Sequence, residues 1–443
     1  MMDSIVAARA QSRARSNAAF REARRYFPDG TSRATVERDG GPIYVTRGEG
    51  AHLVDLDGSR FLDLNNNFTT LIHGHAFPPV VEAVSRTVRD GTCFANPTEH
   101  EIALAALLVE RIPAIESIRF VNSGTEAVMF AIKTARAVTG KTNVIRFEGA
   151  YHGASDWAEV GQSNSPANWG PVQRPSSVPG YHGAPASVAD DVTVLPFNDV
   201  DALEHAIGSV GGRTACILID VMPSRAGLIE PEPEFIQAIM ELARRHSILI
   251  VSDEVLNLRQ GYQGASERHG LTPDLITAGK IIGGGFPIGA IGGASEVMRV
   301  FSAEHGRPAV PQGGTFSANP VSMVAGLATM QAMNEDAFSR LEHFGDEVRL
   351  GLRTAIARSG APFCVTGTAS LFRIHPRSEL PRTYREAFMS AEQEETMRRL
   401  TRHCISHGIS LPIGASACLS TAMTAADIEH VIEVFDDFIS QTY

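Results

Sequence analysis

The stretch Ile248-Leu-Ile-Val-Ser-Asp253-Glu-Val255 places a carboxylate just behind a run of apolar residues. A second run, Ile276-Thr-Ala-Gly-Lys280, ends in a lysine and continues into Ile281-Ile-Gly-Gly-Gly285. Short, continuous apolar runs are typical of strands that are buried on both faces of a parallel sheet. A charged side chain at the end of such a strand is costly unless it is paired. Asp253 and Lys280 are therefore candidate site residues.

The middle of the chain repeats this pattern. Apolar runs alternate with helix-like segments at Ile118–Val121, Ala127–Val138, Val144–Phe147, Cys216–Ile219, Phe235–Arg245 and Leu275–Ile276. This alternation predicts an α/β fold, with a mostly parallel sheet covered by helices on both faces. In such sheets ligands bind beyond the carboxyl ends of the strands, which is where Asp253 and Lys280 are expected.

The flanking segments predict smaller units. Pro42–Val45 and Ala51–Leu56 alternate like strands, and Asp57-Gly58 predicts the turn that follows them. A long helical pattern runs from Val321 to about Ala357, before a tail of mixed short strands and helices. We predict an N-terminal helix and small-sheet segment (1–75), a large domain (76–325) and a small α+β domain (326–443) that the N-terminal segment joins.

Composition limits the function classes. The net charge of −11 and the absence of Lys/Arg runs in the body of the chain argue against nucleic-acid binding, and no apolar run reaches the length of a membrane span. The five cysteines are scattered without metal-ligand spacing, so we predict no metal site and interpret them as reduced thiols of a cytoplasmic protein. Met1–Tyr26 predicts a helix packed on a partner subunit rather than a transit peptide.

Two segments are candidates for binding a phosphate. Ser123-Gly124-Thr125-Glu126 follows a predicted strand and opens a helix, where free backbone N–H groups and a glycine suit an anion. The alternative is a capping box formed by Ser123 and Glu126, and both interpretations can hold together. Gln312–Ser317, which contains Thr315, also precedes a helix; its alternative is a loop with a hydroxyl cap.

The remaining polar positions suggest a cofactor. Tyr151-His152 follows the strand that ends at Phe147, so Tyr151 is placed to lie on a planar ring, although such pairs are more often packing. An amine and a carboxylate at the ends of buried strands are what pyridoxal phosphate chemistry requires. The alternatives are a helix cap or salt bridge for Asp253 and a surface position for Lys280.

Taken together, these segments resemble the class III, fold type I pyridoxal phosphate aminotransferases. Within that family they are similar to glutamate-1-semialdehyde aminomutases and β-amino-acid aminotransferases. The motifs occur in the family's order over nearly the whole chain: Leu62-Asp63 to His73-Gly-His75, Asn122–Glu126, Tyr151–Gly153, Asp253–Val255, Gly279–Gly285, and Gly314-Thr315 to Asn319-Pro320.

The resemblance implies pyridoxal 5'-phosphate (PLP) as the cofactor and assigns its contacts. Lys280 would carry PLP as a Schiff base, and Asp253 would bind the ring nitrogen. The phosphate would be held by Ser123, Gly124 and Thr125, and the ring would lie near His152, between Tyr151 and Val255. Thr315 would reach the phosphate of the neighbouring subunit, which implies a homodimer with interfacial sites.

The substrate side departs from the family pattern. Arg33 aligns with an arginine that binds a substrate carboxylate, a task that suits a guanidinium, and the alternative is a solvated side chain. Asn67, Phe68 and Arg225 would shape the pocket, with Arg225 standing where relatives have a small or amide residue. Asp220-Val221 replaces the family's Glu-Pro, and the segment from 411 to 417 has no charge.

We therefore predict a cytoplasmic, homodimeric aminotransferase that moves an amino group from an amine or amino acid to a 2-oxo acid, with β- and ω-amino acids as candidate donors. An aminomutase, racemase or decarboxylase on the same scaffold is the alternative. A non-catalytic relative would not need both Lys280 and Asp253. A nucleotide-binding oxidoreductase would need a G-x-G-x-x-G turn after its first strand, and the sequence has none there.

Overall fold

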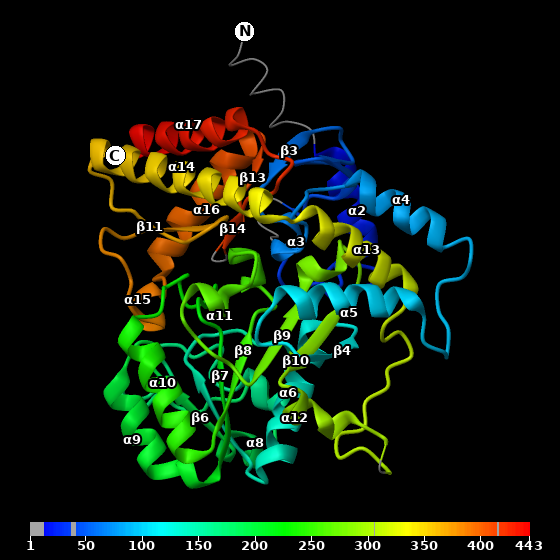
Figure 1. The fold of residues 1–443 in the computed structure, drawn as a ribbon. Helices are drawn as coiled ribbons and strands as arrows, with labels where there is room; N and C mark the ends of the chain where they lie inside the picture. Colours follow the sequence, from blue (N-terminus) through cyan, green and yellow to red (C-terminus); the bar gives the residue numbers. More distant parts are fainter. Residues whose placement is uncertain (1–12, 37–40, 305, 414–415) are drawn as a thin grey trace.

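The computed structural model describes residues 13–36, 41–304, 306–413 and 416–443 (Figure 1). The first half of the predicted N-terminal helix lies outside these residues, and its second half is α2 (Ala14–Ala23). Backbone N–H groups of Arg15 and Ser16 in α2 bond to the Asp57 carboxylate, which docks the helix on the turn after the second strand. Within the described ranges, no helix combines the length and hydropathy needed to cross a membrane.

A seven-stranded sheet in the order β4-β10-β9-β8-β7-β5-β6 forms the centre of the larger part of the molecule. Its strands are β4 (Ser117–Val121), β5 (Asn143–Phe147), β6 (Val192–Leu195), β7 (Thr214–Ile219), β8 (Leu249–Asp253), β9 (Leu275–Gly279) and β10 (Gly289–Gly293). Neighbours from β6 to β9 are parallel, whereas β10 is antiparallel to both β9 and β4. The α/β fold with a mostly parallel sheet is as predicted.

Helices cover both faces of this sheet. Helix α6 (Gly124–Thr139) packs on one face, and α9 (Val200–Val210) and α10 (Pro233–His246) pack on the other. In β7, Cys216 and Leu218 belong to the core beneath α6, whereas Ile217 and Ile219 belong to the core beneath α10. Successive strand side chains point to opposite faces, so a strand buried on both sides must be apolar throughout.

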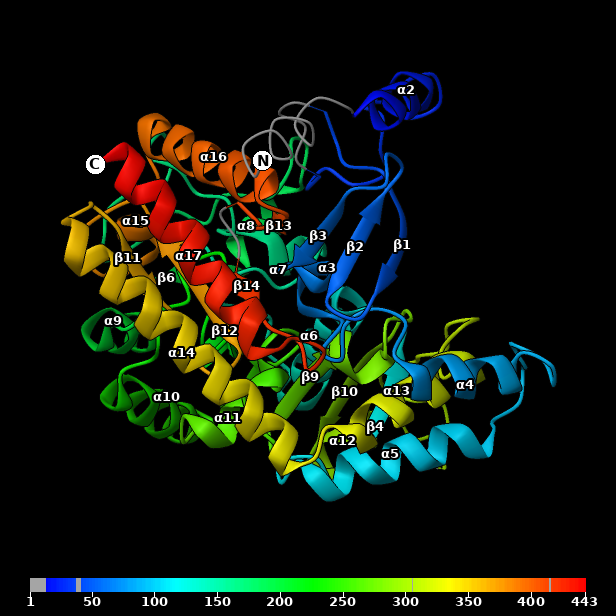
Figure 2. The same ribbon diagram turned by 90° about the horizontal axis from the view of Figure 1, so that it is seen from above.

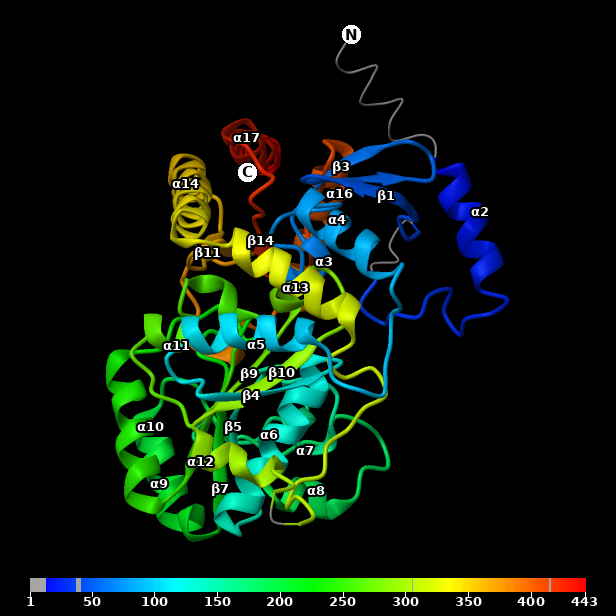
Figure 3. The same cartoon turned by 45° about the vertical axis from the view of Figure 1, so that its right-hand side comes forward.

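The connecting helices surround the sheet. They are α4 (Pro78–Thr87), α5 (Glu99–Arg111), α7 (Asp156–Glu159), α8 (Ala186–Asp190), α11 (Ala265–Arg268), α12 (Ser295–Met298) and α13 (Pro320–Ala332). Figure 3 shows α5 and α13 between the large sheet and the part of the molecule that contains α14 and α17.

The long helical pattern that begins at Val321 is two helices rather than one. Helix α13 ends at Ala332, and α14 (Glu335–Ser359) begins after Asn334. The Asn334 side chain caps α14 by accepting a hydrogen bond from the Ala337 N–H at 2.9 Å. Asparagine is a preferred N-cap residue, so Asn334 marks the start of a new helix within a stretch whose apolar spacing looks continuous.

Two small sheets complete the fold. One has the order β1-β2-β3-β13 and the other β11-β12-β14. Their strands are β1 (Val45–Glu49), β2 (His52–Asp55), β3 (Arg60–Asp63), β11 (Cys364–Thr366), β12 (Leu371–His375), β13 (Ile409–Ser410) and β14 (Ala417–Cys418). The strand expected at Pro42–Val45 starts only at Val45, where pairing with Asp55 begins, and Pro42 has no N–H to offer a sheet.

The C-terminal helices α15 (Tyr384–Ala387), α16 (Ala391–Ser406) and α17 (Ala425–Thr442) complete the smaller part together with α14. Figure 2 shows α14 and α17 side by side, and these two helices pack against each other. Parallel pairing of β13 with β3 joins the C-terminal region to the N-terminal strands. The domain boundaries at 75 and 325 remain our proposal.

Candidate active site

Two neighbouring strands carry the acid and the amine to one edge of the large sheet. Strand β8 ends at Asp253, and Lys280 follows the last residue of β9. The strands are parallel, and Asp253 is paired in register with Thr277. Lys280 has a left-handed backbone (φ 50°), a strained conformation for a residue with a side chain that is found most often at functional sites.

Three hydrogen bonds hold the Asp253 carboxylate. Its Oδ2 accepts from His152 Nδ1 at 2.7 Å, and its Oδ1 accepts from Thr277 Oγ1 at 3.0 Å and from the Val255 N–H at 3.1 Å. The side chain is almost fully buried. A carboxylate offers about four lone pairs, so this arrangement fixes the group and leaves about one acceptor position for a ligand N–H.

His152 is fully buried beside Asp253. Burial lowers the pKa of His152, although the hydrogen bond and charge of Asp253 oppose that shift. The ring is therefore neutral, with its proton on Nδ1 toward the carboxylate. Its Nε2 is buried and has no hydrogen-bond partner among the described residues.

Lys280 and Asp220 are both shifted toward their neutral forms. Burial lowers the pKa of Lys280 to about 8, against the opposing charges of Asp253 and Asp220. Burial, with a contribution from the charge of Asp253, raises the pKa of Asp220 to about 8. Asp220 also accepts hydrogen bonds from the Met222 N–H at 2.9 Å and from Asn257 Nδ2. An amine with this pKa is partly unprotonated near neutral pH and therefore nucleophilic.

The start of α6 is the segment that was predicted to bind a phosphate. The Ser123 side chain accepts from the Glu126 N–H at 3.1 Å, which is half of a capping box. The other half is displaced, because the Glu126 carboxylate accepts from the Asn122 N–H at 2.7 Å rather than from Ser123. The N–H groups of Gly124 and Thr125 lie in the first helical turn, where no intrahelical acceptor exists.

Val255 lies close to both Gly124 and the strand that leads to Lys280. A Cβ at Gly124 would be 2.7 Å from Val255 Cγ1, and a Cβ at Gly279 would be 3.3 Å from the same atom. Thr125 Oγ1 accepts from the Ala154 N–H at 3.2 Å, which ties the turn after Tyr151 to α6. The start of α6, Val255 and the strand end that leads to Lys280 therefore lie together.

Tyr151 is half-exposed on this turn, and Arg225 lies over it. The Arg225 guanidinium carbon is 5.6 Å from the centre of the Tyr151 ring. Arg373 Nη1 fixes the loop by donating to the Ser224 and Arg225 carbonyls at 2.8 and 3.1 Å. Arg225 is exposed, and no carboxylate in the described parts of the chain forms an ion pair with it.

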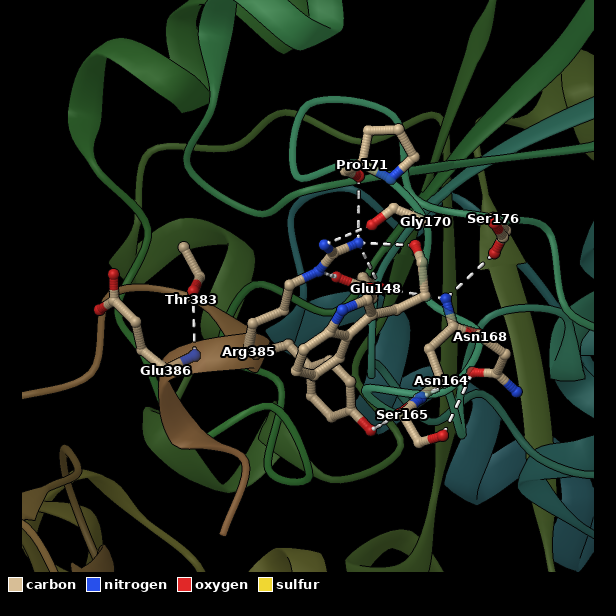
Figure 4. A network of polar contacts seen from close by, with 12 residues as sticks. Glu148, Asn164, Ser165, Asn168, Gly170, Pro171, Ser176, Thr383, Arg385 and Glu386 are labelled. Atoms are coloured by element: carbon tan, nitrogen blue, oxygen red, sulfur yellow. Dashed lines mark hydrogen bonds and ion pairs between the residues drawn. The ribbon is translucent and has the colours of Figure 1, made fainter. Parts of the chain in front are cut away.

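Figure 4 shows a buried ion pair between Arg385 and Glu148. Glu148 begins the segment that carries Tyr151 and His152. Arg385, from α15, donates to both Glu148 carboxylate oxygens at 2.8 and 3.2 Å. It also donates to three backbone carbonyls at 2.7–3.1 Å, those of Trp169, Gly170 and Pro171. We name this set the Glu148–Arg385 latch. It connects α15 both to the end of β5 and to the long loop after α7.

The segment that contains Asn67 and Phe68 is a left-handed helical turn. Asn66, Asn67, Phe68 and Thr69, which form α3, have φ values of 47°, 51°, 53° and 71°. Left-handed turns of L-residues cost about 1–2 kcal/mol per residue. Side chains compensate: Asp63 Oδ1 accepts from the Asn65 and Asn66 N–H groups at 2.9 and 3.0 Å, and Asn65 accepts from Phe68.

This turn brings two of the predicted substrate residues together. Arg33 Nη1 donates to Asn67 Oδ1 at 2.9 Å, and both side chains are exposed. Thr315 lies elsewhere, exposed on the loop before α13, with its carbonyl 3.7 Å from Cys93 Sγ. The segment expected to lack charge, 411–417, includes residues 414 and 415, which lie outside the described chain.

The sequence interpretation missed several supporting residues. Thr277 could have been found, because it is a polar residue inside the apolar run before Lys280. Glu148 directly follows the strand that was predicted to end at Phe147, and no role was predicted for it. Arg385 gave no signal, because it pairs with a residue 237 positions away.

An amine and a carboxylate at the carboxyl edge of a mostly parallel sheet, beside a helix N-terminus, define a PLP-dependent transferase of fold type I. The family described as aminotransferase class III matches residues 35–396, and the chain belongs to this family. The family depends on PLP, and the lone pair left on Asp253 and the free N–H groups of α6 suit its ring nitrogen and phosphate.

The curated relatives and solved structures that are similar to this chain include an aminomutase and two transaminases. A glutamate-1-semialdehyde 2,1-aminomutase from Methanothermobacter thermautotrophicus is 35% identical over 96% of this chain and 99% of its own length. An ω-transaminase from Sphaerobacter thermophilus has a TM-score of 0.94 and 44% identity over 97% of this chain and 98% of that one. A β-phenylalanine aminotransferase from Variovorax paradoxus has a TM-score of 0.88 and 30% identity over 100% of this chain and 98% of that one.

Proposed function

We propose that this enzyme transfers an amino group from a β- or ω-amino acid, or a related amine, to a 2-oxo acid in a ping-pong reaction. The observation that carries the proposal is the placement of Lys280 and Asp253 at the ends of adjacent parallel strands. The likeness to an ω-transaminase over nearly the whole chain supports transfer between two substrates.

The proposed cofactor contacts follow from the assembled groups. Asp253 holds the pyridine nitrogen, and Ser123, Gly124 and Thr125 hold the phosphate. Tyr151 covers one face of the ring and Val255 the other, with His152 keeping Asp253 in place. When bound, PLP supplies an electron sink for the bond broken at the donor carbon.

Lys280 is proposed to move the proton. Its pKa near 8 lets Nζ accept a proton from the donor carbon and release it again at a pH close to neutral. Asp220 and Asp253 lie close enough for their charges to act on this amine. The same residue therefore serves as covalent anchor and as general base.

Two arginines are proposed to select carboxylated substrates. Arg33, oriented by Asn67 and next to Phe68 in the left-handed turn, binds the donor carboxylate. Arg225, which has no ion-pair partner in the described structure, offers a second anion site for a 2-oxo dicarboxylate. Arg33→Gln and Arg225→Gln should each raise KM, for the donor and for a dicarboxylate acceptor respectively, with smaller changes in kcat.

The second candidate is an internal amine shift of the aminomutase type, favoured by the curated relatives. The two functions differ in their need for an acceptor. Incubation of the holoenzyme with β- and ω-amino acids, with and without a 2-oxo acid, separates them by product analysis. Turnover only with the acceptor supports aminotransfer; isomerisation without it supports the aminomutase. A purified enzyme whose visible absorbance persists in Lys280→Ala would contradict both.

We further propose a homodimer in which Thr315 reaches the phosphate of the second subunit. Thr315 and the neighbouring Phe316 are exposed, as are Phe94 and the α5 residue Ile102. Large apolar side chains that are exposed in a single chain are suited to burial against a second copy of the chain. Light scattering should give twice the chain mass, and Thr315→Ala should weaken PLP binding without dissociating the dimer.

A further inference from the structure

Two histidines and an aspartate converge between α16 and α17, away from the site described above. His403 lies in the last turn of α16, and His407 follows the end of that helix. Asp437 lies on α17, which packs against α16 (Figure 2). One ligand atom from each of the three residues lies within 4.8 Å of the others.

The contact between His403 and Asp437 has the spacing of two metal ligands. His403 Nε2 is 3.3 Å from Asp437 Oδ2, and it is shielded from water, yet it has no hydrogen-bond partner among the described residues. Two ligands that are each about 2.1 Å from a tetrahedral zinc ion are about 3.4 Å apart.

Hydrogen bonds orient two of the three ligands, His407 and Asp437. His407 Nδ1 is 2.9 Å from the His403 carbonyl, which can only accept, so Nδ1 carries the proton and Nε2 keeps its lone pair. Gln441 Nε2 donates to both Asp437 oxygens at 2.8 Å. The His403 ring lies 5.6 Å from the ring of Phe438. Such support of the ligands by surrounding groups is typical of metal sites.

We propose that His403, His407 and Asp437 bind a divalent transition metal of the zinc type, which fastens α16 to α17. Histidines four residues apart at a helix end place both imidazoles on one side, as in zinc-binding helices. Two nitrogens and one oxygen form a three-ligand site whose fourth position is taken by water. This proposal departs from the prediction of no metal site, which was made from the spacing of the cysteines, and the site is separate from the PLP chemistry.

The chain provides a matched control. His343 and Glu347 on α14 also form a histidine–carboxylate pair at 3.3 Å, but they are exposed, and no third ligand joins them in the described structure. His343→Ala therefore removes an equivalent pair without affecting the proposed site. Zinc binding to any exposed histidine–carboxylate pair would be weakened by this control as well.

The test uses tag-free holoenzyme and zinc chloride. Titration calorimetry should show one zinc ion per chain bound at this site, and zinc should raise the melting temperature. His407→Ala and Asp437→Asn should each weaken this binding at least about tenfold, and Gln441→Leu by about 10–100-fold, as for outer groups in other metal sites. His343→Ala should leave it unchanged.

The result is interpreted only for variants that keep the wild-type circular dichroism spectrum and PLP absorbance. His407 and Asp437 are only partly buried, so both variants should fold. The proposal is overturned if wild-type enzyme takes up no zinc, or if zinc affinity and the melting shift survive in both His407→Ala and Asp437→Asn.

Discussion

Replacement of Arg385 by methionine should loosen the PLP site from a distance. Arg385 donates to Glu148 through two contacts and to three backbone carbonyls, and its side chain is only 12% exposed. Methionine fills a similar volume but leaves the Glu148 carboxylate, which is 3% exposed, with Asn164 Nδ2 as its remaining donor. Breaking a buried ion pair by removing one member costs about 3–5 kcal/mol.

The matched control is Arg382→Met. Arg382 lies three residues earlier, is 82% exposed and is 3.9 Å from Glu386. An exposed pair of this kind contributes about 0–1 kcal/mol. The free energies of unfolding of the two holoenzyme variants, measured in urea at one protein concentration, should therefore differ by at least about 2 kcal/mol. This is the gap between the range for a buried pair and the range for an exposed pair.

The effect should also reach the cofactor. The latch supports the turn that carries Tyr151 and His152, so part of its loss should appear as faster release of PLP, with each 1.4 kcal/mol giving about a tenfold change. Adding Glu148→Gln to Arg385→Met removes the orphaned charge, so the double variant should lose less stability than the two single changes summed. Equal stability and equal PLP release in Arg385→Met and Arg382→Met would refute this reasoning.

Further tests concern titration and backbone strain. Recombination of apoenzyme with PLP should accelerate as pH rises through about 8, where Lys280 loses its proton, and then level off; a rate that keeps rising to pH 10 would contradict this. The pKa of Asp220 is about 8 in the folded protein, whereas the ordinary pKa of an aspartate, which applies when the chain is unfolded, is 3.8. Apoenzyme stability should therefore fall with rising pH across that window, and the fall should be smaller in Asp220→Asn when followed by urea unfolding. Gly149→Ala should weaken PLP binding, because its Cβ would lie 2.0 Å from the Tyr384 ring at φ +75°. Gly140→Ala has a similar φ but open space around it, and PLP affinity equal in the two variants would argue against the clash.

Strand and helix periodicity was sufficient to predict the large sheet, because strands buried on both faces must be apolar throughout. Asp253 and Lys280 could be identified for the same reason, because a charged residue at the end of an apolar run is unusual. Strands β6 and β10 of this sheet were not predicted. Strand β6 is only four residues long, Val-Thr-Val-Leu. In β10, four of the five residues are glycine or alanine, so it lacks the β-branched residues that are typical of strands.

The contacts that depend on tertiary structure could not be found this way. Glu148 and Arg385 are distant in sequence, and neither has an unusual local pattern. The left-handed turn had a partial signal in Asn65-Asn66-Asn67, since asparagine tolerates positive φ, but Phe68 and Thr69 do not suggest it. His403 and His407 have the helical spacing of zinc ligands, whereas their third ligand comes from another helix.

The left-handed turn restricts how the pocket can be altered by protein engineering. Residues 66–69 hold positive φ without a glycine, so most replacements at Asn67 or Phe68 act on backbone conformation before they act on pocket shape. A saturation library at these positions should be enriched in glycine, asparagine and aspartate among its folded members and depleted of valine and isoleucine. Changes to substrate range are better sought at Arg33 and Arg225, where the side chain can vary without this constraint.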